Sequence, residues 1–241
     1  MKRALVLICA FAIVTPHAQT PTRKKLLFLT YVALYKYSSL APAEKAVTEL
    51  GAKGGFEVTT LEGYMQDTSA IDLSIITPAY LAQYDGLMLM TNGNLPITDA
   101  QKQAIVDYVR GGHGLVGVHC ASLTLYDYPQ FGALLGGYYR RSIVPTNRID
   151  ERHVGVLKVE DPSHPATKML GGSWPIVEEF YQFGTEVWDA SRPTENVSQV
   201  GRLHIPLAFS RNNVHVLLSL DTDKTDISDL GPEIKKGGDY F

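Results

Sequence analysis

Apolar and polar positions along this chain alternate between strand-like and helix-like patterns. Residues 25–32 (KLLFLTYV) are almost continuously apolar, as expected of a strand covered on both faces. Residues 43–53 carry apolar side chains at helical spacing and precede two glycines, and residues 56–61 predict a second strand. The order strand, helix, strand implies a right-handed crossover within a parallel sheet.

The same alternation continues toward the middle of the chain. We expect a short helix over residues 78–83, a buried strand over residues 86–90 and a longer helix over residues 99–110. Thr98 and Gln101 stand at the spacing of a capping box, in which each side chain bonds the backbone N–H of the other residue. The pattern therefore predicts that this helix begins directly after Thr98.

The stretch GGHGLVGVHCAS (residues 111–122) follows that helix and carries titratable groups. Its glycines end the helix, and a short apolar run is expected to form a buried strand in the middle of the sheet. The run ends at His119 and Cys120. Polar groups at the end of a buried strand are unfavourable unless paired, and open parallel sheets bind ligands at the carboxyl ends of their strands. His119 is therefore a candidate functional residue, the alternative being an incidental histidine on a core strand.

The second half of the chain shows more strand patterns than helix patterns. A short helix is expected over residues 128–135, a strand over residues 154–160, and a turn with a short helix from about Pro165. Residues 177–183 (VEEFYQF) alternate acidic and aromatic side chains and predict one strand with a polar face and an apolar face. Further strands are expected over residues 199–203, 206–210 and 214–220.

Composition and charge narrow the class of protein. The chain has 241 residues, and 45% of them are hydrophobic, which is enough for a sizeable core. The net charge of −3 is spread along the chain and argues against nucleic acid or an anionic membrane as a partner.

The N-terminal residues have the pattern of a secretory signal peptide. Lys2 and Arg3 form a basic start, residues 4–14 form an apolar run too short to span a bilayer, and small residues near Ala18 supply a cleavage site. We expect a signal peptide over residues 1–18, and the alternative is a buried N-terminal strand.

Export would place the mature protein in the periplasm or outside the cell. A basic linker over residues 19–24 would then precede the folded domain. Cys9 would be removed with the signal peptide, so Cys120 would remain without a partner for an intrachain disulfide.

Several residues are candidates for chemistry on a ligand. Histidine suits acid–base work because its ordinary pKa of about 6.5 lies near working pH, and a glutamate beside it can orient the ring or share the proton. The candidates for this role are His119, His164 and Glu179, with Glu178 as the alternative acid. The alternative for His164 is that it caps a short helix, and the alternative for Glu178 is that it is solvated. The candidate substrate-binding residues are Tyr37, Asn92, Ser122 and Tyr181.

Five ordered motifs resemble the ThuA-like family (trehalose-utilisation type), and the resemblance extends from about Lys25 to the end. It implies a flavodoxin-like, class I glutamine amidotransferase-like fold, with three layers, a mostly parallel central sheet and extra β-strands in the second half. It also implies a protein of carbohydrate utilisation with a small carbohydrate as partner. The motifs are GGHGLVGVHCAS, YPQFGALLGGYY, EDPSHPATKML, EEFYQF and VHVLLSLD.

The resemblance brings the candidate residues to one cleft at the carboxyl edge of the sheet. We expect His119, as the base, and Glu179, as its partner, to line one pocket, with His164 at or near it. The reaction would be acid–base chemistry on a sugar or keto-sugar, and the alternative is a non-catalytic carbohydrate-binding module. A Cys120-dependent amidotransferase or hydrolase is a third alternative. It lacks the usual Gly-x-Cys-x-Gly elbow, because His119 stands at the nucleophile position.

The chain also departs from the family pattern. Tyr37 stands where the family usually has histidine, and residues 140–142 stand where it often has His-Pro. The pattern continues past Phe241, which implies that the domain over residues 25–241 lacks its C-terminal end and that an unpaired strand edge there favours homo-oligomers. No cofactor is predicted, although two histidines and a carboxylate leave a divalent metal open.

Overall fold

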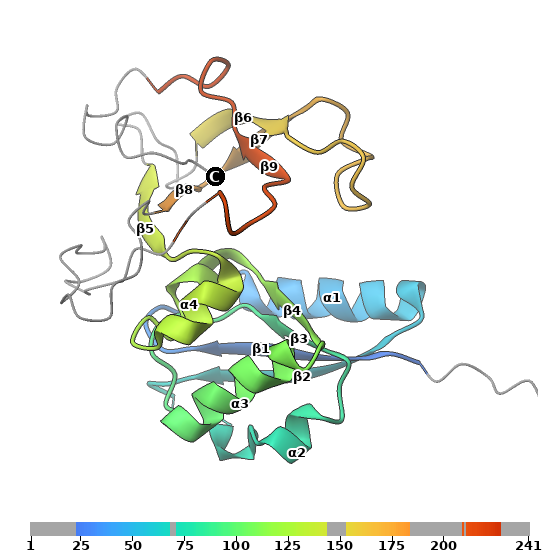
Figure 1. Ribbon diagram of the computed structural model, residues 1–241, viewed down its shortest axis with the longest axis vertical. Helices are drawn as coiled ribbons and strands as arrows, with labels where there is room; N and C mark the ends of the chain where they lie inside the picture. The colour runs from blue at the N-terminus through green and yellow to red at the C-terminus, as the bar shows by residue number, and fades with distance from the viewer. Residues whose placement is uncertain (1–22, 68–70, 144–152, 184–208, 210, 228–241) are drawn as a thin grey trace, which may run out of the picture.

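The computed structural model describes residues 23–67, 71–143, 153–183, 209 and 211–227. Its first half contains a four-stranded parallel sheet in the order β2–β1–β3–β4 (Figure 1). The strands are β1 (Lys25–Val32), β2 (Glu57–Tyr64), β3 (Gly86–Leu89) and β4 (Gly114–Gly117). The predicted signal peptide and residues 19–22 of the predicted linker lie outside the described residues. The strand expected at 199–203 also lies outside them, as does the strand expected at 206–210 except for Phe209.

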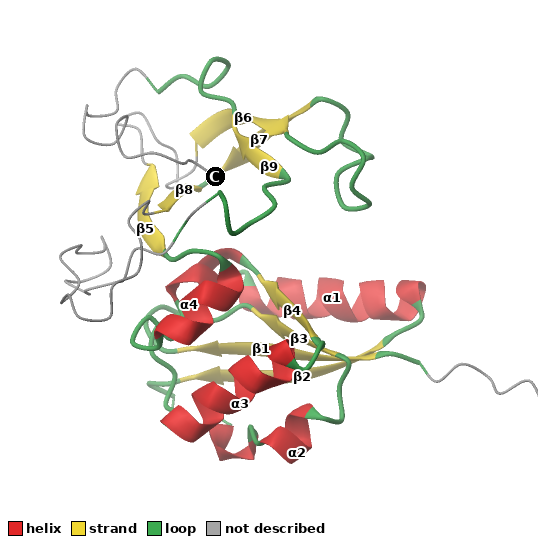
Figure 2. Ribbon diagram, viewed as in Figure 1, coloured by secondary structure: helices red, strands yellow, loops and turns green. Residues whose placement is uncertain are grey.

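Helices cover both faces of this sheet, so the predicted three-layer α/β architecture is confirmed (Figure 2). Successive side chains of a strand point to opposite faces. On one face, Phe28 packs in a cluster with Val47 of α1. On the other face, Leu27 belongs to a cluster with Ile105 of α3 and Leu81 of α2. The helices are α1 (Leu40–Gly54), α2 (Pro78–Leu81) and α3 (Asp99–Arg110), with a short 3₁₀ turn at Leu73–Ile75 before α2.

The N-terminus of α3 forms as its sequence predicts. The Thr98 hydroxyl accepts a hydrogen bond from the Gln101 backbone N–H at 3.3 Å, and the Gln101 side-chain oxygen accepts one from the Thr98 N–H at 3.0 Å. This reciprocal box satisfies two backbone donors that a helix end leaves unpaired. The helix therefore begins at Asp99, as expected.

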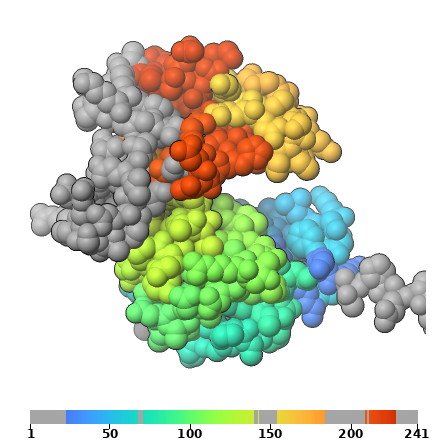
Figure 3. Space-filling view, in the orientation of Figure 1, coloured from blue at the N-terminus to red at the C-terminus, as the bar shows by residue number. Residues whose placement is uncertain are grey.

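The second half adds strands, as the fold prediction stated, and these strands pair antiparallel. Helix α4 (Pro129–Leu135) leads into β5 (Tyr139–Ile143), which pairs with β8 (Phe180–Phe183). A separate sheet has β6 (His153–Val159) between β7 (Ser173–Glu178) and β9 (Leu218–Leu220). Figure 3 shows this antiparallel part stacked on the parallel part, with a hollow between them on the visible face.

Three local predictions for the second half were wrong. Residues 177–183 form two strands rather than one, because β7 pairs with β6 whereas β8 pairs with β5, and Glu179 lies at the break. The segment from Pro165 forms turns instead of a helix, since the Thr167 hydroxyl donates back to the Asp161 carbonyl. In the stretch 214–220, only Leu218–Leu220 pairs as a strand.

The position of β4 also differs from the prediction. It was expected as a buried strand in the middle of the sheet, but among the described strands it lies at the sheet edge and pairs with β3 alone. Val116 is 49% exposed as a result. The strand spans four residues, with glycine at both ends, and so carries little apolar surface to bury. Within the described part of the chain, no helix has the length and apolar character needed to cross a membrane.

Candidate functional site

A sharp turn after β4 presents His119 at the carboxyl end of the parallel sheet. The Val118 N–H still donates to the Leu89 carbonyl at 2.8 Å, and the chain then enters a 3₁₀ helix over His119–Leu123. His119 has a φ of 52°, in the left-handed region that few non-glycine residues adopt. Such strained positions persist where surrounding contacts hold them, and they cluster at functional sites. The turn therefore singles out His119 as the presented side chain.

Glu179 faces His119 from the break between β7 and β8. The two side chains approach to 3.3 Å between His119 Nε2 and Glu179 Oε2, and they are 31% and 25% exposed respectively. The Ser142 hydroxyl on β5 donates a short hydrogen bond to the same carboxylate. The structure therefore brings together the two residues expected to form the acid–base pair.

The surroundings of this pair fix its charges. Burial alone would lower the pKa of His119, but hydrogen bonds and charge from Cys120 and Glu179 outweigh it and raise that pKa to about 10. Burial alone would raise the pKa of Glu179, but the hydrogen bonds from His119 and Ser142 and the charge of the imidazolium lower it overall. At neutral pH the pair is therefore an imidazolium beside a carboxylate.

Two tyrosines and a cysteine underlie the imidazole. The Tyr181 hydroxyl lies 3.1 Å from His119 Nδ1 and 3.2 Å from its Nε2. Cys120 Sγ lies 2.9 Å from the Tyr181 hydroxyl and 2.6 Å from the Tyr37 hydroxyl. Burial, followed by the neighbouring Cys120, raises the pKa of both tyrosines, so both hydroxyls keep their protons. Cys120 is 6% exposed and does not line the pocket described next, so the structure offers a Cys120 nucleophile no open approach.

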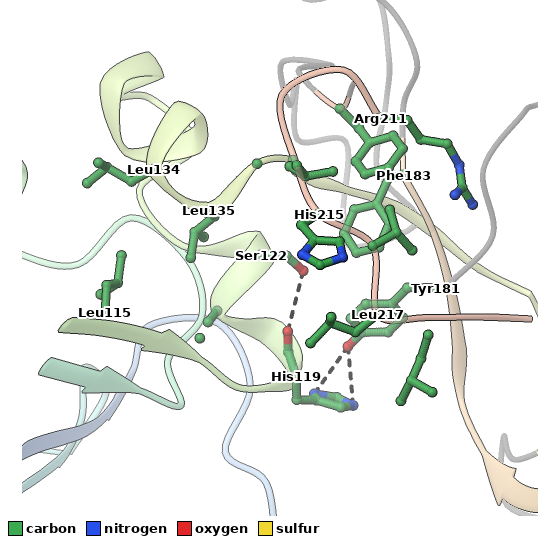
Figure 4. A pocket seen from close by; sticks show the side chains of 18 of the residues that line it. Leu115, His119, Ser122, Leu134, Leu135, Tyr181, Phe183, Arg211, His215 and Leu217 are labelled. Atoms are coloured by element: carbon green, nitrogen blue, oxygen red, sulfur yellow. Dashed lines mark hydrogen bonds between the residues drawn. The ribbon is translucent and has the colours of Figure 1, made fainter. Parts of the chain in front are cut away.

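The pair opens onto a pocket of about 420 Å³ between the two halves of the protein (Figure 4). This volume lies within the range of small-molecule sites, and leucine, valine and phenylalanine side chains form much of the wall. The polar side chains of the lining are His119, Ser122, Glu179, Tyr181, Arg211 and His215.

Arg211 and His215 were not among the residues that sequence reasoning selected. His215 Nε2 lies 3.2 Å from Asp161 Oδ2, and Arg211 makes two contacts to Glu160, at 2.8 and 3.2 Å. His215 is the only histidine in the apolar run VHVLLSL, and this position could have indicated a functional residue. That run was interpreted only as a buried strand.

The remaining predicted residues lie at different distances from the pocket. Ser122 lines it beside His119, whereas Tyr37 lies behind Cys120. Asn92 is buried, and its side-chain oxygen accepts the backbone N–H groups of Ala33 and Leu34 at 3.1 and 2.8 Å. Asn92 therefore holds the loop after β1, and it is not part of the pocket lining.

The two other titratable candidates lie outside the pocket lining. His164 sits in the turn after β6, where its Nδ1 accepts the Ala166 N–H at 3.2 Å, and its ring lies 6.1 Å from that of His215. Glu178, the alternative acid, is exposed at the end of β7. Among the described residues, no three or more His, Cys, Asp or Glu side chains are grouped so that they could hold a metal ion.

The chain is similar to one protein family and to six solved chains, among them two ThuA-like proteins. The family model "ThuA: Trehalose utilisation" matches residues 25–227. A putative ThuA-like protein from Bacteroides uniformis ATCC 8492 has 22% identity and a TM-score of 0.51, over 69% of this chain and 64% of its own. A putative ThuA-like protein from Parabacteroides merdae ATCC 43184 has 19% identity and a TM-score of 0.51, and the match covers 66% of this chain and 63% of that protein. This chain thus spans less than two thirds of the length of either structure, and no curated protein matches it.

Proposed function

We propose a function that starts from the family of this chain, which belongs to the ThuA family, described as trehalose utilisation. We propose that the protein is an exported enzyme that moves a proton on a sugar or keto-sugar. The observation that supports the proposal is the His119–Glu179 ion pair at the wall of the pocket. Export would use the signal peptide predicted over residues 1–18.

The charges of the pair assign a direction to the proton. His119 begins protonated and donates a hydrogen bond, then the proton, to the carbonyl oxygen of a keto-sugar. Glu179 takes the proton from the carbon next to that carbonyl, and the substrate becomes an enediol. The sequence alone gave His119 the role of base, whereas the opposite pKa shifts of the two groups favour Glu179 in that role. With a glycoside, His119 would protonate the leaving oxygen.

The rest of the pocket suits a small, neutral carbohydrate. Its apolar wall can pack against the C–H face of a sugar ring, and the hydroxyls of Ser122 and Tyr181 can bond sugar hydroxyls. At the rim, the charge of Arg211 is paired with Glu160, and Asp161 Oδ2 lies beside His215 Nε2. These residues therefore do not favour a ligand with a strong negative charge.

Incubation with a panel of disaccharides, trehalose included, and 3-keto-sugars tests the proposal. The wild-type chain is expected to convert at least one of them, and His119→Ala is expected to abolish conversion. His113→Ala is the matched control, because His113 stacks on Tyr108 at the end of α3 and does not line the pocket. If no sugar is turned over and binding is unchanged in His119→Ala, the catalytic proposal fails. Binding without product in the wild type would instead indicate a carbohydrate-binding module.

A further inference from the structure

Polar side chains line the pocket only at one end and at its rim. At the end, the Tyr181 hydroxyl lies 3.1 Å from His119 Nδ1, and Glu179 Oε2 lies 3.3 Å from His119 Nε2. Ser122 follows in the same turn of chain, and its hydroxyl donates to the His119 carbonyl at 3.4 Å. We call these four residues the polar end of the pocket.

The two polar residues of the rim are Arg211 and His215, and solvent reaches both of them. Their side chains are 42% and 68% exposed, and they lie 2.8 Å from Glu160 and 3.2 Å from Asp161 respectively. All remaining side chains of the lining are apolar. The wall away from the polar end and the rim therefore offers a ligand no polar side chain.

The apolar side chains of the lining come from both halves of the protein. Figure 4 shows Leu134 and Leu135 of α4 on the opposite side of the pocket from Tyr181. The rings of Phe183 and Phe209 stack with their centroids 5.8 Å apart. Six partly exposed residues, which we call the apolar side of the pocket, have apolar surface that a ligand can cover: Leu134, Leu135, Phe183, Phe209, Val214 and Leu217.

Hydroxyl groups and apolar groups differ in how well they suit the apolar side. A sugar hydroxyl that leaves water needs a new hydrogen-bond partner, and its burial without one is unfavourable. The polar end supplies such partners for one sugar, whereas a second sugar against the apolar side would gain no polar side chain. An aryl or alkyl group has no hydroxyls to satisfy, and its transfer from water to an apolar wall is favourable.

We propose that the substrate is a glycoside with an apolar aglycone, whose sugar or keto-sugar binds the polar end and whose aryl or alkyl group binds the apolar side. The inference rests on the proposed function for the chemistry at the sugar, and it deepens that function by naming the substrate class. Trehalose, whose second half is another hydroxyl-rich sugar, fits this pocket less well than an aryl glucoside does.

Isothermal titration calorimetry on the full chain tests this preference. Phenyl glucoside and methyl glucoside of the same anomer carry the same sugar, so their affinities differ only through the aglycone. Phenyl glucoside is expected to bind about tenfold more tightly than methyl glucoside, and trehalose no more tightly than methyl glucoside. Equal affinities of the two glucosides, or a preference for trehalose, would overturn the inference.

A polar substitution on the apolar side should weaken the preference. Leu134→Gln places an amide of similar size there, and the ratio of phenyl to methyl glucoside affinity is expected to fall about threefold or more. Leu50→Gln is the matched control, because Leu50 is an exposed residue of α1 that does not line the pocket. An unchanged ratio in Leu134→Gln, or an equal fall in Leu50→Gln, would contradict the assignment.

Benzyl alcohol provides a probe of the apolar side without any sugar. In ¹H–¹³C NMR of the wild-type chain, the methyl signals of Leu134 and Leu135 should move on titration, whereas those of Leu50 should not. If neither glucoside binds, this result decides alone, and unmoved signals of Leu134 and Leu135 overturn the inference.

These measurements separate the inference from the proposed function, because none of them needs turnover. A chain that converts no sugar but prefers phenyl glucoside would retain the apolar side and lose the proposed chemistry. A chain that converts a sugar without any preference for phenyl over methyl glucoside would retain the chemistry and overturn the inference.

Discussion

Two histidine–carboxylate pairs line or border the same pocket, and they differ in their surroundings rather than in their spacing. The His119–Glu179 pair spans 3.3 Å and the His215–Asp161 pair 3.2 Å. The two carboxylates are similarly exposed, Glu179 at 25% and Asp161 at 21%, but the His119 side chain is 31% exposed and that of His215 is 68% exposed. Burial alone would raise the pKa of Glu179, but His119 and Ser142 lower it overall. The pKa of Asp161 is also lowered, mainly by hydrogen bonds from Ser163.

The comparison shows that separation alone does not make a histidine functional. Around the exposed pair, water competes with the partner and screens the charge, so such pairs contribute little. Around His119, Glu179 lies 3.3 Å from Nε2, and the Tyr181 hydroxyl lies against the ring, 3.1 and 3.2 Å from its two nitrogens, within a partly buried site. We therefore assign the proton chemistry to the half-buried His119–Glu179 pair and a peripheral role at the rim to the His215–Asp161 pair.

Loss of the Glu179 carboxylate should have the largest effect. Glu179→Gln is expected to lower kcat/KM about 100-fold or more on the sugar that the wild-type chain converts, because the amide cannot take a proton. Steady-state kinetics measures this. Glu178→Gln is the matched control, since it removes the same charge at the neighbouring, exposed position. An equal loss in Glu178→Gln would show that net charge, and not the pair, is responsible.

The ion pair should also make stability depend on pH. The pKa of His119 is raised in the folded state, so its contribution is complete below the ordinary value of 6.5 and disappears as pH rises toward about 10. The pKa of Glu179 is lowered, so its contribution is present above the ordinary value of 4.5 and disappears in acid. Urea unfolding should show the advantage of wild type over His119→Gln shrinking by about 1–2 kcal/mol between about pH 6 and about pH 10.

A pH-independent difference between wild type and His119→Gln would contradict this account. His215→Gln serves as the control, because the His215 side chain is 68% exposed and solvent screens its contact with Asp161. The same two variants therefore test the contrast between the pairs without any substrate.

The hydrogen bond from Ser142 should have a smaller effect on Glu179. Ser142→Ala removes a donor that lowers the pKa of Glu179, so that pKa rises and the acid limb of the pH–rate profile moves upward. The loss in kcat/KM is expected to be about 3- to 10-fold, as for one hydrogen bond to a charged group. Ser122→Ala removes a hydroxyl from the same pocket without a bond to Glu179, and its acid limb should stay in place. Matching shifts in both variants would contradict the assignment.

The exposed pair should give the smallest effect. Asp161→Asn is expected to change kcat/KM by less than about threefold, because the His215 side chain is mostly exposed to solvent, which screens its contact with Asp161. A loss as large as that of Glu179→Gln would move the proton chemistry to the rim and overturn the contrast between the two pairs.

The parallel half of the fold followed from local patterns. The capping box of Thr98 and Gln101 and the apolar run of β1 are local signals, and each produced its element at the expected place. The edge position of β4 was missed because strand order depends on which segments pair in space, and a short apolar run does not contain that information.

The candidate site was foreseen only in part, for similar reasons. His119 and Glu179 were selected as chemistry-bearing residues, and the structure brings them together. The alternation at 177–183 predicts one strand and gives no sign that the chain leaves one sheet and joins another at Glu179. This change of sheet places the Glu179 side chain beside His119. The contact of His119 with Glu179 arises from long-range packing, so no local pattern predicted that the imidazole would hold its proton.

The central claim is that the His119–Glu179 pair moves a proton beside a sugar carbonyl. The most direct test is deuterium uptake from D₂O at the carbon next to the carbonyl of a 3-keto-disaccharide, followed by ¹H NMR. The wild-type chain and Glu178→Gln should catalyse this uptake well above the rate without protein, whereas Glu179→Gln and His119→Ala should not. Uptake that persists in Glu179→Gln and His119→Ala, or none in the wild type with a bound keto-sugar, would contradict the account.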